Sequence, residues 1–222
     1  MTQKKIIAKI ENQELVKKRH AQIVEAASGL FSKSGFHKTT MREIAEKAKI
    51  DLSYLYKYIS SKDDILYLFY EHIRSQYEHV YQIIYSSEED PILLMKDTLS
   101  SLFITIHDLT HEVLTMYTES RHLERDSLHS VLESESKMVN AFEKIIKRGM
   151  ESGSFKVRDS FMAANILQYL VVIECLRGWN IRDRLAFTEF KESVIDFIMG
   201  GLRVDEDKWR SIKISNRGES DK

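Results

Sequence analysis

The stretch GFHKTTMREIAEKAKIDLSYLYKYISSK, residues 35–62, predicts two short helices joined by a tight turn. Thr40 is the expected N-cap of the first helix, and Glu43, three residues later, completes a capping box. Asp51 is the expected N-cap of the second helix, over residues 52–59. Apolar and small residues recur at the spacings of one face of the first helix, namely Met41, Ile44, Ala45 and Ala48. This pattern predicts a helix-turn-helix.

The second helix of this pair has an apolar and a polar side. Leu55 and Ile59 are four residues apart and are predicted to face inward. Lys49 lies in the preceding turn, where it needs either a left-handed backbone, which costs a non-glycine residue about 1–2 kcal/mol, or a slightly different turn. The side chains predicted to point outward are those of Tyr54, Lys57 and Tyr58.

The composition predicts an all-α protein of two unequal domains. The chain has 222 residues, 43% of them hydrophobic, and a single proline, which favours long helices and a substantial core. No alternating strand pattern of useful length appears. Apolar periodicity predicts about nine helices, and the longer ones cover residues 15–34, 61–85, 91–121 with a bend near 107–110, 126–152, 160–180 and 188–199.

Cysteine usage and hydropathy indicate a cytoplasmic protein. Cys175 is the single cysteine, so no intrachain disulfide is possible. The N-terminal residues lack the apolar core of a signal peptide, and no apolar run approaches the length of a membrane span. We therefore expect a reducing, cytoplasmic location.

The charges are distributed unevenly along the chain. Residues 1–62 contain thirteen basic and six acidic residues, a net charge of +7, whereas residues 63–222 carry −8. A basic N-terminal region on an acidic remainder is typical of a protein whose N-terminal part binds a polyanion. A charged surface without a partner is the alternative. The N-terminal arm either contacts DNA or is only solvated, and its lysines are Lys4, Lys5 and Lys9.

Residues 35–62, with the helix before them, resemble the DNA-binding domain of the TetR family of bacterial transcriptional regulators. The matching residues are Gly35-Phe36, Thr39-Thr40, Ile44-Ala45, Leu55-Tyr56, Tyr58 and Lys62, in register and without gaps. Lys49, Asp51 and Ser53 depart from the usual glycine, serine and glycine, which puts the operator sequence in doubt more than the activity. The resemblance implies a dimeric regulator, expected to be a repressor, that a small ligand releases from a palindromic operator.

The resemblance also implies roles for residues of the two short helices. Leu52, Ser53 and Tyr54 are the expected base contacts in the major groove. The expected phosphate contacts are Thr40, Tyr56, Lys57, Tyr58 and Lys62. For Tyr56, a core tyrosine with a solvated hydroxyl is an equal alternative.

The middle helices are where the family binds its inducer. Polar residues interspersed on apolar faces are typical of a ligand cavity, although core packing is the alternative for each candidate. The candidates are Phe69, Tyr77, Phe103, His107, Leu114, Tyr117, Phe142, Asn165, Tyr169 and Ile173. The stretches YTESR, residues 117–121, and LRGW, residues 176–179, resemble the acyl-CoA-responsive branch of the family. This second resemblance implies a long-chain acyl-CoA with phosphates near Arg121, Arg177 or Arg182.

The last two predicted helices have more apolar surface than one core requires. The additional residues are Val172, Leu176, Trp179, Ile195 and Met199. A helix with surplus apolar surface needs a further partner, and we predict a homodimer through these helices. The predicted domains are an arm and helix-turn-helix at 1–62, a ligand-binding and dimerisation domain at 63–203, and a polar tail at 204–222, in which Trp209 suggests a docking contact.

Two other functions remain as alternatives. An architectural DNA-binding protein without a ligand would share the basic region but have little sequence preference. A metal-dependent hydrolase would use His107 and His111, which are four residues apart on a predicted helix. The chain has no glycine-rich phosphate loop, nucleophile elbow or paired cysteines. We therefore predict no enzyme activity, no cofactor and no metal site.

Overall fold

The computed structural model describes residues 6, 8–87 and 89–203, and these form eleven α-helices and one 3₁₀ helix without a β-strand. The all-α prediction is confirmed. The described residues pack as two compact units: those within 1–76 and 109–134 form unit 1, and those within 77–108 and 135–222 form unit 2. The predictions for Lys4, Lys5, Trp209 and the tail at 204–222 lie outside the described residues.

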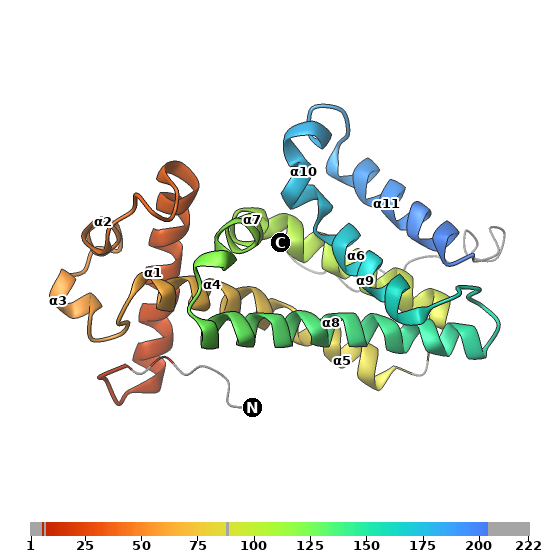
Figure 1. Cartoon of the computed structure of the whole chain (residues 1–222), viewed down its shortest axis with the longest axis horizontal. Coiled ribbons are helices and arrows are strands. Elements are labelled where there is room, and N and C mark those ends of the chain that lie inside the picture. Colours follow the sequence, from red (N-terminus) through yellow and green to blue (C-terminus); the bar gives the residue numbers. More distant parts are fainter. Residues whose placement is uncertain (1–5, 7, 88, 204–222) are drawn as a thin grey trace, which may run out of the picture. The chain divides into compact units, whose positions relative to one another are not determined.

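Unit 1 is a bundle built around the first helix. Helix α1 packs against α2, α4 and α7, and α4 also packs against α7 (Figure 1). Apolar side chains of these helices, such as Ile23, Ile44 and Phe69, are fully buried between them. The elements of unit 1 are α1 (Gln13–Ser34), α2 (Met41–Lys47), α3 (Leu52–Leu55), α4 (Lys62–Gln76), α7 (Thr110–Glu119), η1 (Ser120–His122) and the first residues of α8 (Arg125–Glu151).

The start of α2 has the predicted capping box. The Thr40 backbone N–H donates to Glu43 Oε2 at 2.7 Å, and the Glu43 N–H donates to Thr40 Oγ1 at 3.2 Å. Thr40 Oγ1 also donates to Glu43 Oε2 at 2.8 Å, and the two bonds that this carboxylate accepts from Thr40 hold the pKa of Glu43 below its usual value. Lys49 adopts φ 54°, which is the left-handed of the two alternatives for this turn. The helix-turn-helix prediction is therefore confirmed at its first helix and its turn.

The second helix of the pair is shorter than predicted. Helix α3 ends at Leu55, and Asp51 occupies its N-cap position without a side-chain capping bond. Leu55 and Ile59 are buried as expected. Tyr58 has 0% relative exposure, so its predicted outward orientation is wrong. The chain leaves the helix before Tyr58, and its ring is then turned into the core.

Two long helices of the prediction are each divided in two, which explains why eleven helices are found where about nine were expected. The predicted helix over 61–85 breaks at Tyr77, and the one over 160–180 breaks at Val172. Both residues have φ near −90° and ψ near 0° (−89°, −6° and −95°, 3°), a sparsely populated bridge conformation. Neither is glycine or proline, so no residue type signalled the breaks.

The predicted bend near 107–110 is also a division between helices. Helix α6 (Pro91–Asp108) ends before Leu109, and α7 begins at Thr110. His107 and His111 therefore lie on different helices, and the premise of a hydrolase site on one helix is wrong.

Unit 2 is organised around α6, which packs against α5, α9, α10 and α11 (Figure 1). Phe103 of α6, 1% exposed, contacts Phe190 edge to face, with ring centroids 5.8 Å apart. Besides α6 and the second part of α8, the elements of unit 2 are α5 (Glu78–Ser86), α9 (Ser160–Val171), α10 (Ile173–Ile181) and α11 (Phe187–Gly201).

The packing units differ from the division predicted at Lys62. Residues 63–76 and 109–134 belong to the same compact unit as the helix-turn-helix, because α4 and α7 pack against α1. Within the described part of the chain, no single helix has both the length and the apolar composition of a membrane span, and only the pair α9 and α10, bent by 48°, satisfies both together.

Candidate nucleic-acid interface

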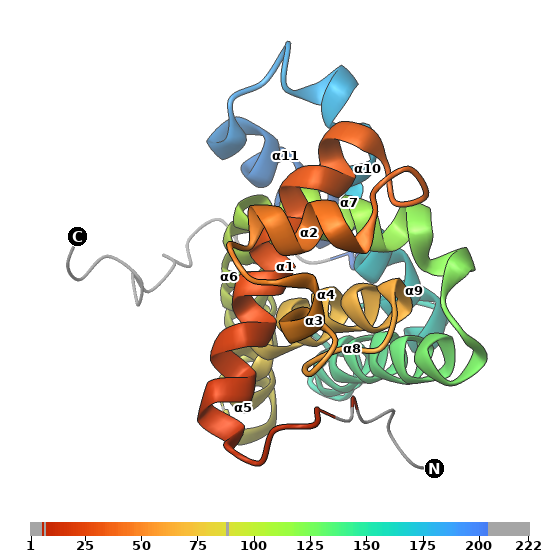
Figure 2. The same ribbon diagram turned by 90° about the vertical axis from the view of Figure 1, so that its left-hand side faces the viewer.

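Helices α1, α2 and α3 face the viewer in Figure 2. Tyr54 belongs to α3, and two cations lie near its ring. The Arg19 guanidinium carbon is 5.7 Å from the centre of the Tyr54 ring, and Lys57 Nζ is 5.4 Å from it. Ser53 and Lys57 are exposed, and Leu52 and Tyr54 are half-buried. The residues predicted to contact bases thus share one accessible helix with positive charge around them.

Tyr58 holds Tyr54 in place from the interior. Its hydroxyl donates to the Tyr54 hydroxyl at 2.7 Å, and the two rings meet edge to face at 5.1 Å. Burial raises the pKa of Tyr58, and the hydrogen bond that Tyr58 donates lowers the pKa of Tyr54. Tyr58 is therefore a positioning residue and not the phosphate contact that the sequence suggested.

The other predicted phosphate contacts differ in accessibility. Thr40 is exposed at the start of α2, and Tyr56 is 43% exposed, which favours a solvent-facing role over a core role. The Lys62 side chain is bound to backbone groups of the protein. Its ammonium donates to the backbone oxygens of Phe36, His37 and Thr39 at 2.8, 3.3 and 3.0 Å.

These three bonds use all the N–H groups of Lys62 and fix the first residue of α4 to the segment between α1 and α2. Nζ also lies 4.5 Å from the centre of the Phe36 ring. Partial burial lowers the pKa of Lys62, whereas the charge of Glu119 raises it. This geometry favours a structural role for Lys62 over the predicted phosphate contact, because its three N–H groups already have acceptors.

Lys62→Met is expected to lower the free energy of unfolding by about 1–3 kcal/mol, since it keeps the aliphatic stem but removes three charge-assisted hydrogen bonds. Urea denaturation of the two proteins measures the change. Lys57→Ala, at an exposed position, serves as the control and is expected to change stability by less than about 0.5 kcal/mol. An unchanged stability of Lys62→Met would return Lys62 to the list of phosphate contacts.

Buried polar contacts that the sequence did not indicate support this surface. His20 Nε2 lies 3.0 Å from the Tyr58 backbone oxygen, and burial lowers the pKa of His20. Asp64 Oδ2 accepts the N–H groups of Ser60 and Ser61 at 2.7 and 3.2 Å. The acidic first turn of α4 was the available signal for the Asp64 contacts. No pattern indicated the pairing of Arg19 and His20 with the α3 region, which is distant in sequence.

The residues predicted to bind a ligand are divided between the two units. Phe69, Leu114, Tyr117 and Arg121 belong to unit 1, whereas the remaining candidates belong to unit 2. Their accessibility also varies widely. Phe69, Phe103 and Phe142 are fully buried, Tyr77 is buried, His107, Asn165 and Ile173 are half-buried, and Leu114, Tyr117, Arg121, Tyr169 and Arg177 are exposed.

Unit 2 contains a cluster of polar side chains formed by His107, Glu174 and Arg182. His107 Nδ1 lies 3.0 Å from the buried carboxylate of Glu174, which also accepts a bond from Arg182 Nε at 3.1 Å. The His107 ring stacks on Phe187 with centroids 3.9 Å apart. Arg182 is thus engaged by Glu174, and Arg177 lies over the Trp179 ring.

A second polar pair of unit 2 joins α8 to α9. Gln168 Nε2 donates to Glu135 Oε2 at 3.0 Å, and burial raises the pKa of Glu135. Asn165 instead donates to the Phe161 backbone oxygen of its own helix. The polar residues that suggested a ligand cavity are therefore mostly satisfied within the protein.

Exposed apolar side chains gather on the last three helices of unit 2. They are Phe161, Met162, Ile166 and Tyr169 of α9, Trp179 of α10 and Phe197 of α11. Of the residues predicted to form this surface, Trp179 is exposed, Leu176 is half-buried, and Val172, Ile195 and Met199 are buried. Exposed apolar side chains are thus present on these helices, as predicted, but most of them are other residues than the ones named from the sequence.

Two family models match the chain. The model described as bacterial regulatory proteins, tetR family, matches residues 23–67, and the tetracyclin repressor-like, C-terminal domain matches residues 95–173. The HTH-type transcriptional regulator HbdR of Aromatoleum sp. (strain CIB) is 21% identical over 211 residues, which cover 95% of this chain and 92% of HbdR.

Two further proteins are similar over most of their length. The fatty acid metabolism regulator protein of Bacillus subtilis (strain 168) is 22% identical over 188 residues, covering 83% of this chain and 95% of the relative. The crystal structure of AibR in complex with isovaleryl coenzyme A and operator DNA has a TM-score of 0.69 at 20% identity, covering 83% of this chain and 97% of AibR. At that identity the structural similarity shows a shared fold.

Proposed function

Because the chain belongs to the tetR family of bacterial regulatory proteins, which are DNA-binding transcriptional regulators and not enzymes, we propose that it is a dimeric repressor released from a palindromic operator by a small apolar ligand. The observation that carries the proposal is the helix-turn-helix of α2 and α3, with an accessible Tyr54 between two cations. An α-helix fits the major groove, and cations beside it neutralise phosphates.

In this proposal residues 1–62 form the DNA-binding domain. Leu52, Ser53 and Tyr54 read base edges, and Lys57, Tyr56 and Thr40 contact phosphates. Tyr58 and Lys62 support the surface from within the protein. The accessibility of Ser53 and Lys57 and the capped start of α2 support these roles.

Residues 63–203 then bind the ligand and form the dimer. The exposed apolar residues of α9, α10 and α11 support a homodimer, because an apolar surface of this kind needs a partner. A two-fold axis between two DNA-binding domains predicts a palindromic operator. A repressor of this type acts in the cytoplasm, where it meets the DNA.

The ligand that the comparisons support is an acyl-CoA. One relative is named for fatty acid metabolism, and AibR was crystallised with isovaleryl coenzyme A. Unit 2 contains both apolar side chains, such as the buried Phe103 and Phe142, and the polar pair of His107 and Glu174, which are the two kinds of group that an acyl-CoA would need. Arg177 is exposed and available to phosphates, whereas Arg182 must first leave Glu174.

Release would follow from a population shift. A ligand that binds the DNA-incompetent conformation more tightly lowers operator affinity by the ratio of its two affinities. The chain passes between the units at residues 76/77, 108/109 and 134/135. The first two crossings coincide with the helix breaks at Tyr77 and Leu109, which are the expected points of bending.

The test combines selection of an operator with titration of the ligand. Selection of binding sites from random DNA is expected to give a palindromic consensus, whereas an architectural protein would give none. Palmitoyl-CoA and isovaleryl-CoA are then titrated against the complex, with free coenzyme A as the control. One of the thioesters is expected to lower operator affinity at least about fivefold. A thioester that binds by calorimetry yet leaves operator affinity unchanged would exclude this mechanism.

A further inference from the structure

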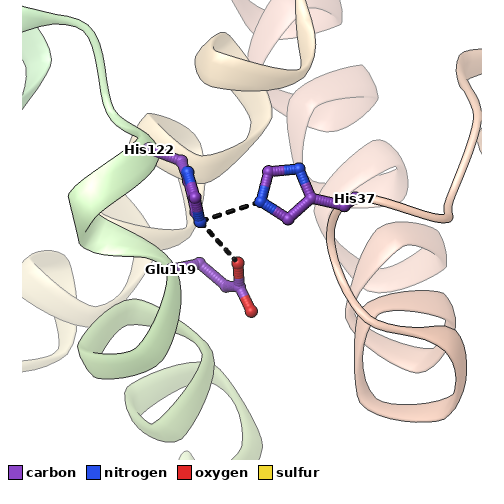
Figure 3. A group of neighbouring side chains, drawn as sticks. All are labelled: His37, Glu119 and His122. Carbon is purple, nitrogen blue, oxygen red and sulfur yellow. Dashed lines mark hydrogen bonds and ion pairs between the residues drawn. The ribbon is translucent and has the colours of Figure 1, made fainter.

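Three side chains from two separate segments of unit 1 meet beside the helix-turn-helix. His37 lies in the turn between α1 and α2, Glu119 ends α7, and His122 ends η1 (Figure 3). Their nearest ligand atoms, two imidazole nitrogens and one carboxylate oxygen, all lie within 4.8 Å of one another. Imidazole and carboxylate are the donor types that bind zinc and related transition metals in proteins.

The protonation states favour metal binding through His122. Its Nε2 lies 2.8 Å from His37 Nε2 and accepts a bond from Arg121 Nε at 3.0 Å. Because an arginine nitrogen donates and never accepts, His122 Nε2 presents its lone pair. His122 is therefore in the tautomer that a metal ligand requires. His37 must move its proton from Nε2 to Nδ1, which leaves the neutral charge of the ring unchanged.

The carboxylate supplies an independent observation. Glu119 Oε2 is buried and accepts no hydrogen bond, and the nearest His122 nitrogen is 3.8 Å away. A buried carboxylate oxygen without a donor is costly. Lys62 acts on Glu119 only through its charge, because its N–H groups are used by backbone oxygens. A cation between Glu119 and the two imidazoles would satisfy this oxygen.

We propose that His37, Glu119 and His122 form a binding site for a divalent transition metal, with Zn²⁺ as the expected ion. A tetrahedral zinc with bonds of about 2.0–2.1 Å separates its ligand atoms by about 3.3 Å. The observed separations of 2.8 and 3.8 Å lie on either side of this value, so modest side-chain movements suffice. Three protein ligands leave the fourth position to water. Arg121 is exposed and is free to swing away from the metal.

The site would join the segment before α2 to the end of α7. His37 precedes the proposed phosphate contact Thr40 by three residues. Glu119 and His122 belong to residues 63–203, which are proposed to bind the ligand and form the dimer. Metal binding would thus restrain two parts of unit 1 in addition to the Lys62 bonds. The metal site itself does not depend on the proposed function, because its test measures metal and not DNA.

The experiment uses the full-length protein after treatment with EDTA and removal of the chelator. Zinc is titrated in competition with a chromophoric chelator, and cobalt is added separately to detect visible absorption of the bound ion. Wild-type protein is expected to bind one Zn²⁺ per chain and to unfold at a higher temperature with zinc than without it. His37→Ala and His122→Ala are each expected to weaken binding at least about tenfold and to remove the thermal shift.

Two further variants distinguish loss of a metal ligand from loss of folding or of an unrelated histidine. Glu119→Gln retains the shape of the side chain but weakens the ligand, so it is expected to reduce zinc affinity while circular dichroism stays unchanged. His111→Ala removes an exposed histidine of α7 that is not part of the proposed site, and it is expected to bind zinc like the wild type. The proposal is overturned if wild-type protein takes up no stoichiometric zinc. It is equally overturned if His37→Ala and His122→Ala bind as tightly as wild type, because the three side chains then form only a hydrogen-bonded contact.

Discussion

Replacing Ile166 and Phe197 together by glutamate is expected to convert the proposed dimer to monomers and to weaken operator binding by about 10³-fold or more. Ile166 of α9 is 54% exposed and Phe197 of α11 is 69% exposed, so neither substitution disturbs the core of unit 2. In a dimer through these helices, both positions would be buried against the partner, where an unpaired carboxylate is strongly unfavourable.

The loss in DNA affinity follows from the loss of one DNA-binding domain. A single domain keeps the non-specific phosphate attraction, with dissociation constants of roughly 10⁻⁴–10⁻⁶ M. Specific dimeric binders reach roughly 10⁻⁸–10⁻¹¹ M. Analytical ultracentrifugation measures the oligomeric state, and fluorescence anisotropy with the selected operator measures affinity at one fixed salt concentration.

Ile104→Glu is the matched control for this prediction. Ile104 is also an isoleucine of unit 2 and is 49% exposed, but it lies on α6, away from the last three helices in sequence. It is expected to leave both the oligomeric state and operator affinity unchanged. If the double variant remains dimeric, the dimer interface lies on another surface. If the wild-type protein is a monomer and still binds the operator with full affinity, the dimer proposal is wrong.

Local sequence signals predicted some of the helix boundaries of this protein. Thr40 with Glu43 marked the start of α2, and the end of α1 at Gly35 has the positive φ of 81° that glycine accepts readily. The breaks at Tyr77 and Val172 were missed, since both residues are common in helix interiors. A break of this kind is determined by packing against other helices. The apolar periodicity of a single segment carries no information about that packing.

In the candidate site, too, contacts between residues distant in sequence could not be predicted from local patterns. Lys62 was predicted from its charge to bind phosphate, but three backbone oxygens of the α1–α2 segment surround its ammonium. Tyr58 was predicted from helical geometry to face outward, but α3 ends before it. His37 and His122 are 85 positions apart and belong to no local motif. Residue types and spacing thus indicated the region that binds DNA, whereas the role of each side chain depended on contacts distant in sequence.

Alanine substitutions of Tyr54 and Lys57 are both expected to weaken operator binding, but in different ways. Tyr54→Ala removes the proposed base contact and is expected to cost about 1–3 kcal/mol in each half-site, with a changed sequence preference. Lys57→Ala removes a phosphate contact, so affinity should fall by a similar factor for every DNA sequence. Its plot of log affinity against log salt should be flatter by about 0.9 for each domain, or about 1.8 for the dimer.

Tyr58→Phe separates positioning from contact at the same surface. The buried ring is retained, but the hydroxyl that donates to Tyr54 is lost. Because Tyr54 then has more freedom and no bond with its neighbour, operator affinity is expected to fall by about 1 kcal/mol per half-site, in the same direction as Tyr54→Ala but less. The salt slope should stay unchanged, because no charge is removed.

Controls outside this surface complete the comparison, and operator affinity is measured across a salt series for all variants. Tyr85→Ala on α5 and Lys147→Ala on α8 remove the same residue types from exposed positions of unit 2 and are expected to have no effect on DNA binding. If Tyr54→Ala and Lys57→Ala weaken binding equally on every sequence and change the salt slope alike, both side chains act on the DNA backbone. Base recognition must then come from Leu52 and Ser53, since these are the remaining accessible side chains in the first turn of α3.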